Sequence, residues 1–296
     1  MIKKFNWLLI AAITIMMSSC TADDMKNSYN QGMVDFTVKT AIPHGITTYA
    51  SHNGGATNVS STYYNLRYIL EAWTKESPPR LAYRGYRIVQ NNFTGTSVDF
   101  TARLLALEYD FVFWADFVDA SVTAPVSGAG AGDLYYKTND GYTDAQLIAD
   151  PTLDKGLTDI LLRQDALAPA YNVSDEARDA FYAVKSVDLR TTSQIGAVTL
   201  YRPFGKFRLV SLDVVDGYLS TTPILKSKIE YTGTTDFPAG FNAQTGAVNT
   251  SVTIDLSAPL TSGIETETAV VGGVNYPNAS ILALDYIFAA PTQTAA

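Results

Sequence analysis

Residues 109–117 read YDFVFWADF, and this stretch decides the fold class of the chain. Alternate positions of this run carry apolar residues: Phe111, Phe113, Ala115 and Phe117. Trp114 and Asp116 lie between them. Successive side chains of a β-strand point to opposite faces of a sheet, so this run predicts a strand with one buried face. We expect Phe111 and Phe113 to be buried and Trp114 and Asp116 to face solvent.

The same alternation of apolar and polar residues recurs along most of the chain. It predicts further strands over residues 34–42, 66–72, 83–89, 98–106, 198–201, 206–214, 226–232, 251–256 and 281–288. Helical spacing is found only over residues 144–148, 159–164 and 174–182. Many short strands separated by Gly, Pro, Asn and Thr indicate a β-sandwich or barrel. The expected fold class is therefore mainly β, with few short helices.

Length and composition favour a globular protein of two domains. The chain has 296 residues, of which 47% are hydrophobic and 17% charged, and domains typically contain about 50 to 250 residues. Residues 121–170 lack a regular pattern and are expected to form an insertion or surface feature. Patterned strands resume after this stretch and a helical segment. We therefore predict an N-terminal β-sandwich domain over residues 33–197 and a C-terminal one over 198–296.

The first twenty residues have the order of a secretory signal. Lys3 and Lys4 precede an apolar run from Trp7 to about Met17, and small residues then lead to Cys20. Such a run is too short to span a membrane. The ending resembles a lipobox, in which the cysteine is acylated and becomes the first mature residue. The sequence thus predicts a signal peptide over residues 1–19, followed over residues 20–32 by lipidated Cys20 and a polar tether.

Charge and cysteine content exclude several partners. The formal charge of −8 includes Lys3 and Lys4, so the mature chain carries −8 − 2 = −10 and has no basic cluster for nucleic acid. Cys20 is the only cysteine, so its lipidation leaves no thiol for a disulfide, a nucleophile or a metal. His44 and His52 lie in one loop at a spacing that is not typical of metal ligands. We expect no metal and no cofactor.

No catalytic signature is present in the sequence. Nucleophile elbows, zinc-protease motifs and phosphate loops are all missing. Asp110, Asp116 and Asp119 lie near Trp114, and a pair of acids beside an aromatic ring could cleave glycosides. The interpretation of these residues as the solvent side of a strand is favoured, so we expect the protein not to be an enzyme.

Four motifs in order resemble the fimbrillin-like lipoproteins of Bacteroidales, which are subunits or accessory proteins of type V pili. They are YDFVFWADF at 109–117, DLYYK at 133–137, RDAFY at 178–182 and RPFGKFRL at 202–209. The resemblance implies two tandem transthyretin-like β-sandwiches and assembly with other pilin subunits by β-strand exchange, with a host protein or glycan as a further ligand. It also implies export through the inner membrane to the cell surface, with the lipid on Cys20 in the outer membrane. Asp23 and Asp24, close behind Cys20, resemble the surface-export signal of such lipoproteins.

Two features refine this expectation. In the family a protease commonly cuts after a basic residue near the first strand, but residues 43–62 contain no Lys or Arg, which favours a tip, anchor or accessory role. The last predicted strand is followed by few residues, so the second domain is expected to be incomplete. The chain would then be either a truncated product or a terminal subunit that donates no strand to a neighbour. Its predicted strand-exchange edge comprises Leu282, Leu284, Tyr286 and Phe288.

A second class of function remains open at this point. The protein could be a glycan-binding surface lipoprotein of an oligosaccharide uptake system. Exposed aromatic platforms would support that alternative, and the mature chain has two tryptophans, Trp73 and Trp114, with many tyrosines.

Overall fold

The computed structural model describes residues 32–43, 63–90, 97–124, 132–139, 142–150, 155–163, 176–211, 228–259 and 265–289. Cys20, His44 and His52 lie outside these segments, so their predicted roles stay predictions. Within them, none of the helices has the length and apolar character needed to cross a membrane.

The first β-sandwich pairs a three-stranded sheet with a four-stranded sheet. Sheet A has the order β4-β1-β9, with β4 at Ser97–Leu105, β1 at Met33–Ala41 and β9 at Gln194–Thr199. Sheet B has the order β3-β2-β5-β8, with β3 at Leu81–Val89, β2 at Tyr64–Thr74, β5 at Glu108–Asp119 and β8 at Ala180–Asp188. All pairings are antiparallel except β1 with β9.

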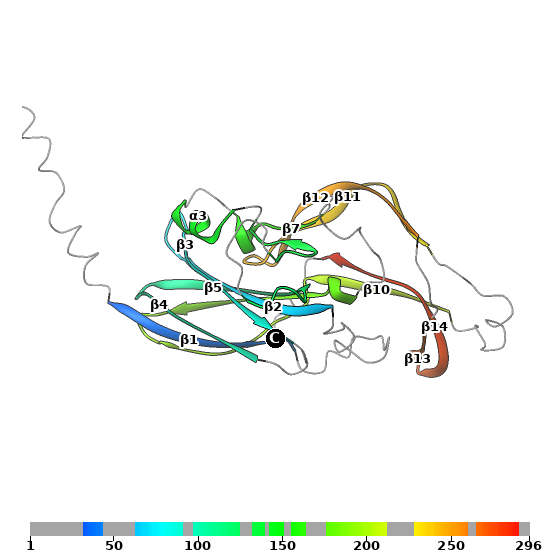
Figure 1. Cartoon of the computed structure of the whole chain (residues 1–296), viewed down its shortest axis with the longest axis horizontal. Helices are drawn as coiled ribbons and strands as arrows, with labels where there is room; N and C mark the ends of the chain where they lie inside the picture. Colours follow the sequence, from blue (N-terminus) through cyan, green and yellow to red (C-terminus); the bar gives the residue numbers. More distant parts are fainter. Residues whose placement is uncertain are drawn as a thin grey trace, which may run out of the picture.

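The second β-sandwich combines strands from both halves of the sequence. Its larger sheet has the order β12-β11-β7-β6, from Ala247–Pro259, Lys228–Asn242, Ile160–Leu162 and Tyr136–Lys137. Its smaller sheet has the order β10-β14-β13, from Phe204–Ser211, Val274–Phe288 and Glu265–Val271. In Figure 1 the late strands of this second unit, β11 to β14, are coloured yellow to red, whereas β6 and β7 are green because they come from the middle of the chain.

The predicted fold class, mainly β with sandwich domains and few short helices, is confirmed. The described residues contain one α-helix, α3 at Asp144–Ala149, and two short 3₁₀ helices, η2 at Gly156–Thr158 and η3 at Glu176–Arg178. The predicted domain boundary between residues 197 and 198 falls inside β9. Strands β6 and β7, which precede that boundary in sequence, pair within the sheet of β11.

Phe111 and Phe113 lie in the core of the first sandwich, as the alternation in β5 predicts. Both side chains are fully buried, and Phe111 packs edge-on against Phe36 of β1, with ring centroids 5.0 Å apart. This contact joins sheets A and B across their facing surfaces. The prediction that these two rings are buried is therefore confirmed.

The expectation that the other face of β5 meets solvent is wrong. Trp114 and Asp116 are both fully buried, because segments of residues 132–163 and the β11–β12 hairpin cover this face of sheet B. Trp114 lies 5.5 Å from the Tyr136 ring of β6 and 6.5 Å from Phe241 of β11, measured between centroids. Strand β5 is thus a central strand with apolar cover on both sides.

The polar residues on this covered face form buried ion pairs between neighbouring strands. Arg67 of β2 donates from Nε and Nη2 to both oxygens of Asp116, at 2.8 and 2.6 Å. Glu71 of β2 pairs with Arg84 of β3 and accepts hydrogen bonds from Trp73 Nε1, at 2.9 Å, and from the Leu157 backbone amide. Buried charges persist only when they are paired in this way, so the alternation of apolar and polar residues in β2 does not mark a solvent face.

Two of the three predicted helices are replaced by other structure. The first one, at residues 144–148, is confirmed as α3, and its N-cap Thr143 forms a capping box with Gln146. Residues 159–164 instead include strand β7, and residues 180–182 begin strand β8, preceded only by η3. In the second case the backbone of Ala180 and its successors pairs with β5, and these hydrogen bonds override a weak helical pattern.

An aromatic seam joins the two sandwiches. It is a chain of ring contacts with centroid distances from 4.9 to 5.7 Å, and it runs through Trp114, Tyr136, Phe204, Phe288, Phe241 and Tyr182. Each of the four motifs quoted above contributes at least one of these rings. The motifs therefore meet at the junction of the two sandwiches.

Candidate interaction site at the free edge of β8

Strand β8 is the last strand of sheet B and pairs along one side with β5. On its other side, Tyr182 exchanges two backbone hydrogen bonds of 2.8 Å with Tyr201. Backbone groups alternate in direction along an antiparallel strand, so Val184 and Ser186 also direct their N–H and C=O groups away from β5. Among the described residues, no strand pairs with these four groups.

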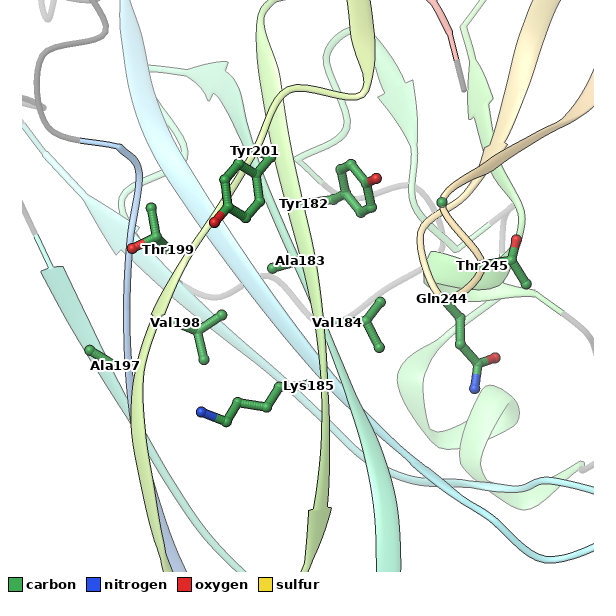
Figure 2. A pocket seen from close by; sticks show the side chains of 11 residues that line it. Tyr182, Ala183, Val184, Lys185, Ala197, Val198, Thr199, Tyr201, Gln244 and Thr245 are labelled. Carbon is green, nitrogen blue, oxygen red and sulfur yellow. The ribbon is translucent and has the colours of Figure 1, made fainter. Parts of the chain in front are cut away.

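This free edge lies in a cleft of about 530 Å³. One wall is β9, and the other is the turn between β11 and β12. In Figure 2, Lys185 extends from β8 toward β9, whereas Val184 points toward the turn that carries Gln244. Alternate residues of β8 thus face alternate walls, as the geometry of a strand requires.

The turn wall is fixed by its own hydrogen bonds. Asn242 Oδ1 accepts from the backbone amides of Gln244 and Thr245, at 2.9 and 3.0 Å. Gly246 has a φ of +68°, and a Cβ atom at this position would lie 3.0 Å from Tyr182 Oη. Glycine therefore permits both the left-handed turn and its close approach to β8.

Tyr182 anchors β8 against the second sandwich. Its ring meets Phe241 edge-on, with a centroid distance of 4.9 Å, and burial raises the pKa of its phenol. The hydroxyl thus stays protonated at neutral pH. On the same face, Asp110 accepts from Ser186 Oγ at 2.6 Å and from Gln244 Nε2 at 3.3 Å, so β5, β8 and the turn are linked.

The predicted strand-exchange edge lies in β14. Leu282, Leu284, Tyr286 and Phe288 all belong to this strand, and the side chains of Tyr286 and Phe288 are buried. The side chains of Leu282 and Leu284 lie outside what the structure describes. Strand β13 pairs with residues 274–281, and among the described strands only β10 pairs with residues 282–288.

An ion pair occupies the other side of β14 at Tyr286. Arg178 of η3 pairs with Asp285 and donates from Nη2 to the Tyr286 carbonyl oxygen, at 3.3 Å. Asp285 Oδ1 accepts from the Tyr286 amide at 2.8 Å, and its Oδ2 accepts from Tyr231 Oη at 2.7 Å. At Tyr286 these side chains satisfy the backbone groups that a neighbouring strand would bond. At this position β14 is therefore less accessible to an added strand than the edge of β8.

The acidic residues near Trp114 do not assemble a catalytic pair. Both oxygens of Asp116 accept from Arg67, which leaves neither oxygen directed at a substrate. Asp119 lies at the end of β5 and accepts from the Ser121 amide at 2.8 Å. No cluster of three potential metal ligands occurs in the part of the chain that the structure describes.

The sequence interpretation missed the β8 edge because residues 174–182 were expected to be helical. Alternation from Phe181 to Val187 gives the signal that could have found it, since Phe181, Ala183 and Val187 are apolar and buried. Lys185 is the exception in this series. The pairing partners of β8 cannot be read from such a pattern.

The chain belongs to a family of unknown function (DUF6562), whose model matches residues 26–296. No curated protein matches the sequence. Similar solved structures include the fimbrial anchor protein Mfa2 from Porphyromonas gingivalis, with 12% identity, a TM-score of 0.39, and coverage of 87% of this chain and 74% of that one. They also include the tip fimbrial protein Mfa3 from Porphyromonas gingivalis with C-terminal truncation, with 13% identity, a TM-score of 0.41, and coverage of 89% and 71%. The function proposed below rests on the residues of this chain.

Proposed function

We propose that this chain is a lipid-anchored protein of the bacterial cell surface with a structural or adhesive role. In this proposal it is a fimbrial subunit, or a tip or accessory component, that binds other subunits by β-strand addition. The observation that carries the proposal is the edge of β8 that lines a cleft and, among the described strands, has no partner at Val184 and Ser186. The export signal, Cys20 and the four motifs that resemble fimbrillin-like lipoproteins support it.

The β8 edge has what strand addition requires. Val184 and Ser186 offer two N–H and two C=O groups to an incoming strand, and each hydrogen bond would contribute about 0.5 to 1.5 kcal/mol net. Side chains of that strand would point alternately to the β9 wall and to the turn wall, which gives specificity beyond the backbone pairing. The walls also restrict edge-to-edge pairing between copies of the chain.

The absence of Lys and Arg from residues 43–62 favours a role other than that of a protease-processed shaft subunit. An accessory, anchor or tip component needs to accept or cap a partner without losing its own first strand. In this chain β1 lies between β4 and β9, and it supplies Phe36 to the core. Retention of β1 keeps the first sandwich intact, as the accessory role requires.

Val184→Pro should abolish partner binding while leaving the fold intact. The Val184 amide points away from β5, so proline removes only a free donor and places its ring where the new strand would lie, and edge strands tolerate proline at such positions. Capture of partner pilins by the purified protein measures the effect, and circular dichroism and thermal melting report the fold. Val184→Thr keeps the amide and serves as the control. Equal capture by Val184→Pro and wild type would rule out the β8 edge as the contact.

Cys20→Ser should release the protein from the membrane fraction. Acyl chains contribute about 0.8 kcal/mol per buried methylene group, so a multiply acylated Cys20 would supply most of the membrane affinity. Cell fractionation and metabolic labelling with a fatty-acid analogue measure the change. Continued labelling of the Cys20→Ser variant would contradict the assignment.

A glycan-binding function is the second candidate, and one feature of the cleft favours it. Tyr201 is 65% exposed and lines the cleft next to β8, where its ring could stack on a sugar. A glycan array run in parallel with capture of pilins separates the two functions. Binding to an oligosaccharide without any pilin partner would replace the fimbrial proposal.

A further inference from the structure

We infer that the segment accepted at the β8 edge carries a carboxylate group that faces Lys185. This inference rests on the function proposed above and names the chemistry of the partner. The occupant is an extended peptide segment with an acidic side chain at one defined position.

On its face of β8, Lys185 lies between apolar residues. It lies directly opposite Phe111 of β5 in the strand register, so it shares the face of sheet B that packs on sheet A. On that face of β8, Ala183 and Val187 are buried, whereas Lys185 is partly buried. Its side chain extends from β8 toward β9 (Figure 2).

The charge of Lys185 has no carboxylate partner among the described residues. By contrast, the ammonium groups of Lys75, Lys155 and Lys206 each lie within 3.4 Å of an acidic oxygen. Asp110 of β5 faces the opposite side of sheet B, because it alternates with Phe111. A partly buried cation without a partner is satisfied best by an anion that the bound molecule supplies.

The walls of the cleft leave room for such an anion beside Lys185. Gly196 of β9 has no side chain, and Lys185 Nζ, at 3.8 Å, is the one described atom beyond its chain neighbours that lies within 4 Å of the position a Cβ would take there. Directly opposed side chains on paired strands have Cβ atoms about 4.5 to 5.5 Å apart, a distance that Asp and Glu span easily. The same strand would place its neighbouring residues on the turn side, against Val184 and Gln244.

Lys185 also excludes segments of the wrong chemistry. An apolar or basic side chain at this position would remove water from the ammonium group without replacing its interactions, which is unfavourable. Lysines on edge strands are known to protect against unspecific pairing. If Lys185 only prevented unspecific pairing, it would weaken the binding of all segments equally. If it recognises a carboxylate, a segment with glutamate should bind more tightly than the same segment with glutamine.

The test uses three nine-residue peptides that alternate threonine and valine and carry glutamate, glutamine or lysine at the centre. Fluorescence polarisation measures their binding to the purified protein. Wild type should bind the glutamate peptide at least about tenfold more tightly than the glutamine peptide, a difference of about 1.4 kcal/mol. Lys185→Met should lose this preference, and Lys185→Glu should prefer the lysine peptide.

The outcomes separate the inference from the function on which it rests. Equal binding of the glutamate and glutamine peptides to wild type, with binding lost in Val184→Pro, would overturn the role of Lys185 and leave strand addition in place. Self-association of Lys185→Met without any peptide preference in wild type would show a protective role only and overturn recognition. Binding of the peptides that Val184→Pro does not change would remove the β8 edge as the site and overturn both.

Discussion

Arg67→Met should destabilise the protein by about 3 to 5 kcal/mol, because it leaves buried carboxylates without their cation. Arg67 Nη1 also lies 2.7 Å from Asp133 Oδ1, so one guanidinium serves two acids. The side chains of Arg67, Asp116 and Asp133 are at most 3% exposed. Total stabilities are only about 5 to 15 kcal/mol, so this single change approaches the limit for folding. Urea denaturation monitored by tryptophan fluorescence measures the loss.

The loss should depend on pH in a defined direction. Burial raises the pKa of Asp116 even with Arg67 present, and removal of the cation raises it further. Between the unfolded pKa near 3.9 and the higher folded pKa, the folded state binds more protons than the unfolded state. The free energy of unfolding therefore falls as the pH rises through that interval. Arg67→Met should be closer to wild type at about pH 4 than at pH 8.

Two further variants control this experiment. Arg103→Met removes a cation that is 64% exposed and lies 3.8 Å from Asp35, and it should cost less than about 1 kcal/mol. The double variant Arg67→Met/Asp116→Leu should recover part of the loss, since an apolar pair often replaces a buried ion pair without cost. A loss for Arg67→Met equal to that for Arg103→Met would contradict the burial of this charge cluster.

Phe113→Ala should cost about 3 to 5 kcal/mol, the range found for large-to-small changes in packed cores. Phe113 is fully buried and lies between Leu70 of β2 and Ala183 of β8 in the register of sheet B. For a chain of this size the melting temperature should fall by roughly 6 to 20 °C, at about 2 to 4 °C per kcal/mol.

Leu105→Ala provides the matched control in the same sandwich. Leu105 is 43% exposed at the end of β4, so its truncation should change the melting temperature only slightly. An unchanged melting temperature for Phe113→Ala would mean that this face of β5 does not form the core.

The sequence predicts where the strands lie in the chain better than it predicts which elements pack against them. Alternation identifies β1, β2, β4 and β5 because each has at least one apolar face, and it identifies Phe113 as a core residue. Alternation cannot tell that a second layer covers Trp114, since that layer comes from residues far away in the chain. An arginine and an aspartate can pair on a solvent-exposed face as readily as Arg67 and Asp116 pair in the buried layer. Only the fold shows that this pair is buried.

The candidate site shows the same limit. Lys185 looks like an ordinary charge on a short strand until β9 and the turn at Gln244 are placed on either side of it. Its cleft depends on three segments that are separated in sequence and brought together by pairing and by the contact of Tyr182 with Phe241. The β14 edge was predictable as a strand, but the side chain that bonds the Tyr286 carbonyl oxygen belongs to Arg178, about one hundred residues earlier.

The aromatic seam has a consequence for how the chain is made. Tyr136 and Phe241 both cover Trp114, and Arg178 pairs with Asp285 only when nearly all of the chain has been synthesised. Contacts of such large sequence separation form slowly, and until then the outer face of sheet B presents a wide apolar surface. Incomplete chains with such a surface are prone to aggregate. The aromatic seam is thus completed only when the late strands β11 and β14, which carry Phe241 and Phe288, have formed.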